Sequence, residues 1–203
     1  PVLTGSSRPL NTRPFFDRHF VFPVHLSTDQ TTVYLRVRSS FSVTLPIKLW
    51  EQTTFQHYNA KVLLVQFLYF GAHIALFIYN GFLFLSLRDR RFLLFCTYVL
   101  TFSMAMFAGN GFGRLFIWPE WHAFDEVAQV VFLSIAASAV LALTRLFLRP
   151  QTFSNRLDFL LHFEQWLSIV LAMGLIGSLI SGYAIGWINQ FFAINAIAIS
   201  FLV

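Results

Sequence analysis

The longest apolar stretch of the chain runs from residue 62 to residue 87. Its 26 residues carry no formal charge, and a helix of that length spans about 39 Å, more than the ~30 Å hydrocarbon core of a bilayer. Three arginines and one aspartate follow at once, at positions 88–91, as in the cytoplasmic stop of a membrane protein. The pattern predicts a transmembrane helix that runs from outside to inside.

Further apolar stretches predict four more spans, which cover residues 92–112, 127–144, 160–187 and 189–203, the last of them truncated. The loops expected inside carry six arginines, whereas the loops expected outside carry only Arg114, which satisfies the positive-inside rule. All five tryptophans fall near predicted span ends, where an amphipathic ring is most stable. Both observations support the same topology.

Before residue 51 the apolar positions recur with a period of two, over residues 20–26, 33–38 and 43–49. This alternation predicts three antiparallel strands, each with one buried and one wet face. Three strands bury too little surface for a stable domain, so residues 1–50 are expected to be the C-terminal part of a larger β-sandwich. Residues 51–61 are expected to begin the first helix above the membrane, with Thr53 or Thr54 as its cap.

The predicted fold class is therefore a polytopic α-helical membrane bundle, residues 62–203, preceded by the C-terminal strands of an antiparallel β-sandwich. Composition agrees, since 57% of the residues are hydrophobic and 11% are charged, against about 25% charged in a soluble domain. The net charge of +5 comes without a basic run interleaved with aromatics, which excludes a nucleic-acid-binding face. The chain has no starting Met and is expected to be a fragment cut at both ends.

Four polar side chains on the first span are the main candidate for function: Gln66, Tyr69, His73 and Asn80. Their spacing of 3, 4 and 7 confines them to about 60° of the helix circumference. A polar stripe in lipid must face protein or water. It could form ordinary interhelical hydrogen bonds, or it could be an intramembrane relay that switches between two bonding patterns.

Two sequence features near the second loop invite a catalytic interpretation. Gly109, Gly111 and Gly113 resemble a phosphate loop, but no strand precedes them and no Lys-Ser/Thr follows, so this interpretation is rejected. Asp125 and Glu126 could form an acid–base pair, but solvated caps at the mouth of a span explain them better.

Metal and catalytic motifs are weak or absent in the sequence. Asp158, His162 and Glu164 lie within two helical turns, yet a membrane interface explains them equally well. The single cysteine, Cys96, excludes an intrachain disulfide. No catalytic residue, metal site or cofactor is therefore predicted in this chain, and the ligand-binding residues are unknown. Basic side chains on the wet face of the strands could meet an anionic ligand, although a solvated face explains them as well: Arg36, Arg38 and Lys48.

Small residues recur every fourth position in the fourth predicted span, at Gly174, Ser178, Gly182 and Gly186. Such spacing lets two helix backbones approach closely, so this span is expected to pack tightly in the bundle. The alternative is a glycine-broken helix of the kind that transporters use.

Several runs of the sequence resemble a family of bacterial seven-transmembrane receptors with diverse intracellular signalling modules. They are residues 34–40, 45–50 and 79–90, and then 110–113 with 115–119. The resemblance extends from about residue 5 to the end of the chain. It implies a periplasmic jelly-roll sensor that binds a small molecule, of which a carbohydrate is one class, followed by seven spans in the bacterial inner membrane. It also implies a cytoplasmic output module, in such proteins often a diguanylate cyclase or a histidine kinase.

The sequence thus predicts a transmembrane signal-transduction receptor, with the lipid bilayer, an unidentified ligand and a second copy in a homodimer as its partners. A transporter or channel subunit is the alternative, and a membrane-embedded enzyme is a third class. No Asp, Glu, Lys or Arg lies in the middle of a predicted span to form an ion path, which favours the receptor.

Overall fold

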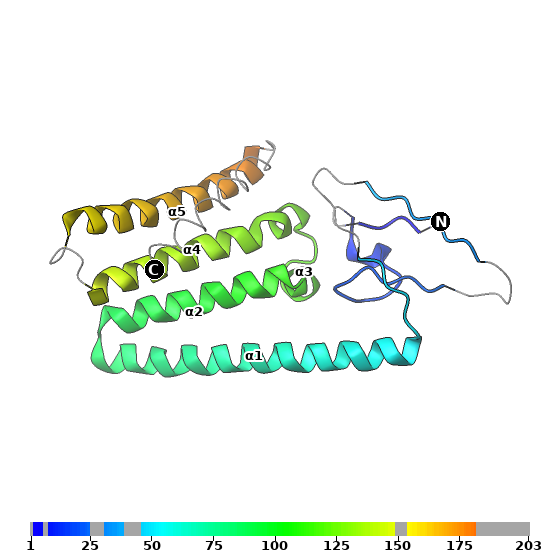
Figure 1. The fold of residues 1–203 in the computed structure, drawn as a ribbon, viewed down its shortest axis with the longest axis horizontal. Coiled ribbons are helices and arrows are strands. Elements are labelled where there is room, and N and C mark those ends of the chain that lie inside the picture. The colour runs from blue at the N-terminus through cyan, green and yellow to red at the C-terminus, as the bar shows by residue number, and fades with distance from the viewer. Residues whose placement is uncertain (1, 6–7, 25–30, 39–45, 149–153, 182–203) are drawn as a thin grey trace.

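A computed structural model describes residues 2–5, 8–24, 31–38, 46–148 and 154–181. Its long helices lie side by side in one row (Figure 1): α1 (Gln52–Leu87), α2 (Arg90–Gly109), α4 (His122–Leu148) and α5 (Asn155–Ser181). All four are long and apolar enough to cross a membrane. The prediction of a helical membrane bundle is confirmed for these four helices, while residues 182–203, where the end of the fourth and the fifth predicted span fall, lie outside the described residues.

The connection between α1 and α2 is a tight turn of two residues. Arg88 adopts the left-handed conformation (φ 53°) and donates its backbone N–H to the Phe84 carbonyl, which ends α1. The Asp89 carboxylate then accepts from the backbone N–H of Arg91 and caps α2. The two helices therefore lie antiparallel and adjacent. At its N-terminus, α1 begins after Glu51, and the Glu51 carboxylate accepts from the Thr54 hydroxyl (3.2 Å). The N-cap residue is therefore Glu51, whereas the sequence suggested Thr53 or Thr54.

The connection between α2 and α4 is more helical than the sequence predicted. Gly111 adopts a positive φ of 78° and lets the chain begin a new short helix, α3 (Phe112–Phe116). Helix α4 then begins at His122, five residues before the predicted start of the third span, with Asp125 in its first turn. An acidic side chain at this position interacts favourably with the helix dipole, which accounts for the earlier start.

Helix α4 forms the centre of the row, because it packs on α2 on one side and on α5 on the other. Its buried residues are largely small, among them Ala128, Ser134, Ala136, Ser138 and Ala139. Small side chains let helix backbones approach closely in lipid, where packing rather than water exclusion holds helices together. Helix α1 lies at the edge of the row and packs mainly on α2, and none of its residues is buried.

The segment before α1 lies at the outer end of the bundle, the end at which α1 begins (Figure 1). In its described part it contains one short 3-10 helix, η1 (Leu10–Thr12), and no strand. Its apolar positions stay exposed, for example Phe20, Val33 and Leu49, as do Arg36, Arg38 and Lys48. Residues 25–30 and 39–45, on which parts of the predicted strands fall, lie outside the described residues, so the β-sandwich stays a prediction.

Candidate functional site

A chain of hydrogen bonds joins the segment before α1 to the first two helices. The Arg18 guanidinium donates to Gln66 Oε1 (2.7 Å), and the Gln66 amide donates to Asn110 Oδ1 (2.8 Å). Asn110 in turn donates to the Met106 carbonyl near the end of α2 (2.7 Å). Gln66 is therefore the point at which the N-terminal segment, α1 and the turn after α2 meet. We call this region the outer junction.

A second hydrogen bond fastens the same segment to α1. The Asn59 amide donates to Asp17 Oδ2 (3.0 Å), while Asp17 Oδ1 accepts from the backbone N–H of His19 (2.8 Å). Asn59 and Gln66 are seven residues apart and therefore share one face of the helix. The N-terminal segment is thus bonded to two successive points of one helix face, about 10 Å apart along the axis.

The turn at Gly111 lies beside the backbone of Arg18, and its left-handed conformation favours a glycine. A Cβ on Gly111 would lie 3.4 Å from the Arg18 Cβ, and the positive φ of Gly111 already disfavours other residues. The Arg18 guanidinium lies 5.4 Å from the centre of the Phe112 ring. Phe112 is 2% exposed and contacts four other rings, those of Phe67, Phe70, Phe107 and Phe116. The Arg18 guanidinium therefore packs against an aromatic cluster of the bundle.

Arg114 lies on α3 and is almost fully buried, with 3% of its surface exposed. Its terminal nitrogen donates to the Arg8 carbonyl and lies 3.2 Å from His122 Nδ1. Its Nε has no hydrogen-bond partner among the described residues. This one arginine of the predicted outer loops therefore forms a third bridge from the N-terminal segment to the bundle.

Arg13 adds further positive charge to the outer junction. Its guanidinium donates to the Asp17 carbonyl (2.7 Å) and lies 4.4 Å from the Phe20 ring centre. Burial first, and then the nearby Arg114 guanidinium, lower the pKa of Arg13, while the carboxylates of Asp125 and Asp17 oppose this shift. The junction is thus a place where cations are held close together, mainly by neutral acceptors.

A buried tryptophan packs between the end of α2 and the first half of α4, with Ala108 and Ala128. Trp118, which is 7% exposed, donates its indole N–H to Asp125 Oδ1 (2.8 Å). Asp125 lies in the first turn of α4, at the mouth of the span as the sequence suggested, and it also binds Trp118. Trp118, which the sequence places near a span end, is buried within the protein. Gly113 makes this packing possible, because a Cβ there would lie 2.0 Å from Trp118 Cζ2.

The polar stripe of α1 is engaged to different degrees along its length. Gln66 bonds to two other segments, as described above. His73 Nδ1 lies 3.0 Å from the Tyr69 carbonyl, and its ring stacks on that of Phe102 in α2 at 6.4 Å. Asn80 donates to the carbonyl of Leu76 in its own helix (2.8 Å). The outer part of the stripe is therefore bonded across segments, and its inner part is satisfied within α1.

At the inner end of the bundle, a polar cluster joins α4 to α5. Arg145 forms an ion pair with Asp158 (2.9 Å) and lies 2.6 Å from His162 Nδ1. The Trp166 indole donates to the other ring nitrogen of His162 (3.0 Å). The described residues hold no group of three His, Cys, Asp or Glu side chains that could bind a metal ion. Asp158 and His162 thus contact an arginine of the neighbouring helix.

The small residues predicted to mediate packing of the fourth span lie only partly within the described residues. No described atom lies within 4 Å of a Cβ placed on Gly174. Ser178 is buried and donates its hydroxyl to the Leu175 carbonyl (2.7 Å). Gly182 and Gly186 lie outside the described residues, so the packing role of this stripe stays a prediction.

Two family models match adjacent parts of the chain. The model described as 7TM diverse intracellular signalling matches residues 63–203, more than half of the chain. The chain belongs to this family of transmembrane signalling receptors. A second model, described as 7TMR-DISM extracellular 2, matches residues 1–51. A search of curated proteins and a search of solved structures each returned no match.

These matches place the outer junction at a domain boundary of the receptor. Arg18 and Asp17 belong to the extracellular domain, whereas Gln66 and Asn110 belong to the seven-transmembrane domain. Asn59 lies in the linking stretch between the two matched regions. Because residues 1–51 are extracellular, α1 begins outside and the turn at Arg88 lies inside. The hydrogen bonds of the junction therefore connect the sensing domain of this receptor family to its membrane domain.

Sequence patterns alone did not reveal most of the junction. Gln66 was identified from its place on the stripe, but its partners were not, because 48 residues separate it from Arg18 and 44 from Asn110. One feature of the sequence did point to the junction. Arg114 is the exception to an otherwise consistent charge asymmetry, and a cation on the wrong side of a membrane needs a specific contact.

Proposed function

We propose that the outer junction transmits ligand binding from the extracellular domain to the helices of this signalling receptor. The observation that carries the proposal is the bond chain from Arg18 through Gln66 to Asn110. It crosses from one family-matched domain to the other. A displacement of the extracellular segment changes these bonds before it changes anything deeper in the membrane.

The geometry of α1 supports this function. The helix is continuous over 36 residues, from Gln52 to Leu87, so movement at its outer part reaches the cytoplasmic turn without an intervening hinge. It also has no buried residue, which makes its position easier to shift than that of α4. The N-terminal segment bonds to it at Asn59 and Gln66. A pull on these two points displaces α1 relative to α2.

A relay through the stripe deepens the same proposal. In our account the signal passes from Gln66 to Tyr69, His73 and Asn80 along the face of α1 that meets α2. His73 stacks on Phe102, so a shift of α1 alters an interhelical ring contact at this depth. Two packings that differ by about 1.4 kcal/mol give a tenfold change in a two-state ratio.

The parts of the receptor beyond the described residues belong to the same proposal. We propose that the extracellular region forms a β-sandwich, whose alternating segments supply the exposed apolar positions of residues 20–24, 33–37 and 47–49. Its ligand is a small molecule, with carbohydrates as the first class to screen. The output, a diguanylate cyclase or histidine kinase activity, resides in a cytoplasmic module, and the receptor works as a homodimer in a bacterial inner membrane.

The test uses the full-length receptor and measures cytoplasmic output with and without ligand. Gln66→Leu removes the bonds of Gln66 to Arg18 and to Asn110 while keeping the side-chain volume about the same. Gln56→Leu is the matched control, because Gln56 is exposed on the same helix and outside the junction. Gln66→Leu is expected to bind ligand normally and to lose the response, whereas Gln56→Leu keeps it. A normal response from Gln66→Leu at normal protein levels would refute the proposal.

A further inference from the structure

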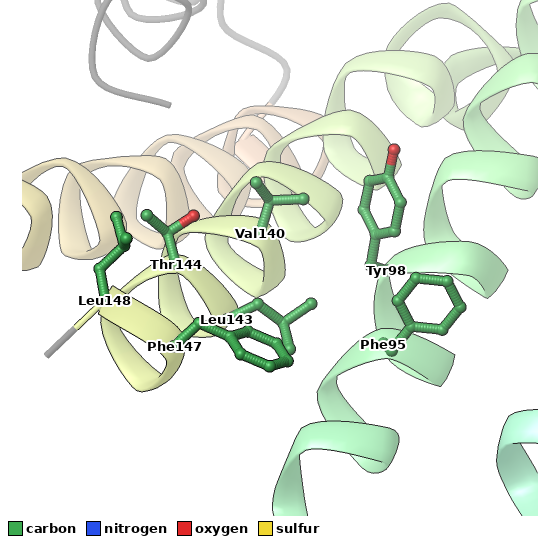
Figure 2. Close-up of a pocket in the computed structure, with 7 residues that line it drawn as sticks. All are labelled: Phe95, Tyr98, Val140, Leu143, Thr144, Phe147 and Leu148. Carbon is green, nitrogen blue, oxygen red and sulfur yellow. The ribbon is translucent and has the colours of Figure 1, made fainter.

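An apolar groove of about 410 Å³ opens between α2 and α4, toward the inner end of the bundle. Figure 2 shows its lining, which includes Phe95 and Tyr98 from α2 and Leu143, Thr144 and Phe147 from α4. The groove belongs to neither the outer junction nor the polar stripe of α1. It lies between two helices that are long and apolar enough to span the membrane, and therefore it is a candidate for a lipid site.

The groove begins at the depth of the inner membrane surface. Phe147 is one residue from the end of α4, and Phe95 is five residues from the start of α2. At 1.5 Å per residue these rings lie within about 8 Å of the helix ends. Tyr98 lies three residues further into α2. The groove thus runs from the interface into the hydrocarbon region, the direction in which a lipid acyl chain lies.

The mouth of the groove carries positive charge. The Arg91 guanidinium lies 5.7 Å from the centre of the Phe147 ring, and Phe147 itself is exposed. Arg88 and Arg90 stand beside it in the sequence, with Asp89 as the one acidic neighbour. Asp89 binds the Nε of Arg91 (3.3 Å), and a guanidinium has further N–H donors with which it can bind a second anion. Residues 88–91 therefore carry a net charge of +2.

We propose that this groove binds one anionic phospholipid of the inner leaflet. One acyl chain lies along the apolar lining, and the headgroup phosphate binds Arg91. The apolar groove between the helices matches the acyl chain, and the basic mouth of the groove matches the anionic headgroup. Basic pockets between transmembrane helices on the cytoplasmic side are known to favour acidic lipid headgroups.

The experiment uses the full-length receptor, stripped of lipid in detergent and titrated with phosphatidylglycerol or phosphatidylcholine of identical acyl chains. Native mass spectrometry counts the lipids bound. Wild-type receptor is expected to retain one phosphatidylglycerol more tightly than phosphatidylcholine. Arg91→Gln is expected to weaken phosphatidylglycerol binding about fivefold, the change expected when one basic residue is removed from an anionic surface. Binding of phosphatidylcholine should weaken less, because its choline cation offsets the charge of its phosphate.

A matched control separates the site from general charge. Arg156→Gln removes one cation near the start of α5, away from the groove lining, and should leave the retained lipid in place. Equal losses from both variants would overturn the proposal, as would unchanged phosphatidylglycerol binding in Arg91→Gln. Neither variant alters a buried side chain, so both are expected to fold.

A second variant tests the groove itself. Leu143→Trp fills the slot and should lower retention of both lipids. If the occupant is instead another helix of this chain, Leu143→Trp lowers the melting temperature and leaves the bound lipid unchanged, and this result overturns the proposal. If Leu143→Trp does not fold, the comparison of Arg91→Gln with Arg156→Gln decides alone.

Discussion

The two ends of the helical bundle hold their arginines in different ways. At the outer end, Arg18 and Arg114 donate to neutral acceptors on segments 48 and 106 residues away. At the inner end, Arg91 and Arg145 pair with aspartates 2 and 13 residues away. In the described part of the chain, both ion pairs lie at the inner end.

This difference corresponds to two tasks. A short-range ion pair forms whenever its local turn or helix pair forms, and it is insensitive to distant domains. A bond across many residues forms only when the extracellular segment is docked, so its presence depends on the position of that segment. The neutral acceptors also make the outer bonds easier to exchange, because breaking them separates no opposite charges. The outer end is suited to switching and the inner end to holding helices in place.

The largest effect is expected from the packing of Trp118 against Gly113. Gly113→Ala places a Cβ 2.0 Å from Trp118 Cζ2, so the indole must move and lose its bond to Asp125. We expect a loss of about 1–3 kcal/mol, as for other overpacked core sites. Thermal unfolding of the full-length receptor in detergent measures it.

The control for this prediction is Gly71→Ala. No described atom lies within 4 Å of a Cβ at Gly71 on α1, so this variant should unfold at the wild-type temperature or slightly above it. Equal destabilisation by both variants would show that Gly113 is not a special contact and that the outer end is packed loosely.

A smaller effect is expected from the inner ion pair. The side chains of Arg145 and Asp158 are 23% and 20% exposed, and a pair of this kind contributes about 1 kcal/mol. A double-mutant cycle of Arg145→Gln and Asp158→Asn should give a coupling energy of this size in thermal unfolding. The response to ligand should keep its wild-type amplitude. A lost response with intact stability would mean that the inner end also switches.

The smallest effect is expected from pH, which should change how strongly the N-terminal segment, residues 8–24, docks onto the outer end of the bundle. Burial first, and then the Arg18 guanidinium, lower the pKa of His19, while Asp17 opposes this shift. The docked state therefore disfavours the charged imidazole. Docking should be unaffected well above pH 6.5, the ordinary value for histidine, and should weaken as the pH falls below it.

Limited proteolysis of residues 8–24 in the full-length receptor, followed from pH 8 to pH 5.5, measures this effect. His19→Gln cannot titrate and should show a flat profile. An unchanged pH profile in His19→Gln would assign the effect to another group.

The helices of this protein could be predicted from the sequence, because lipid imposes a strict requirement for length and low charge that each span meets locally. The turn after α1 is also local, since Arg88 and Asp89 follow the apolar run directly. The outer junction could not be predicted in the same way. Its bonds depend on tertiary placement, and the residues involved, such as Asp17 and Asn110, carry no local pattern. Trp118 illustrates the limit, because its position near a span end predicts an interfacial ring and the structure buries it.

The most direct test of the account is a double-mutant cycle across the domain boundary, with ligand response as the readout. Arg18→Gln, Gln66→Leu and the double variant are compared in the full-length receptor at equal abundance and equal ligand occupancy. If the signal passes through the Arg18–Gln66 bond, each single variant loses the same part of the response and the double variant loses no more. Losses that add in the double variant, or a full response from either single variant, would contradict the account.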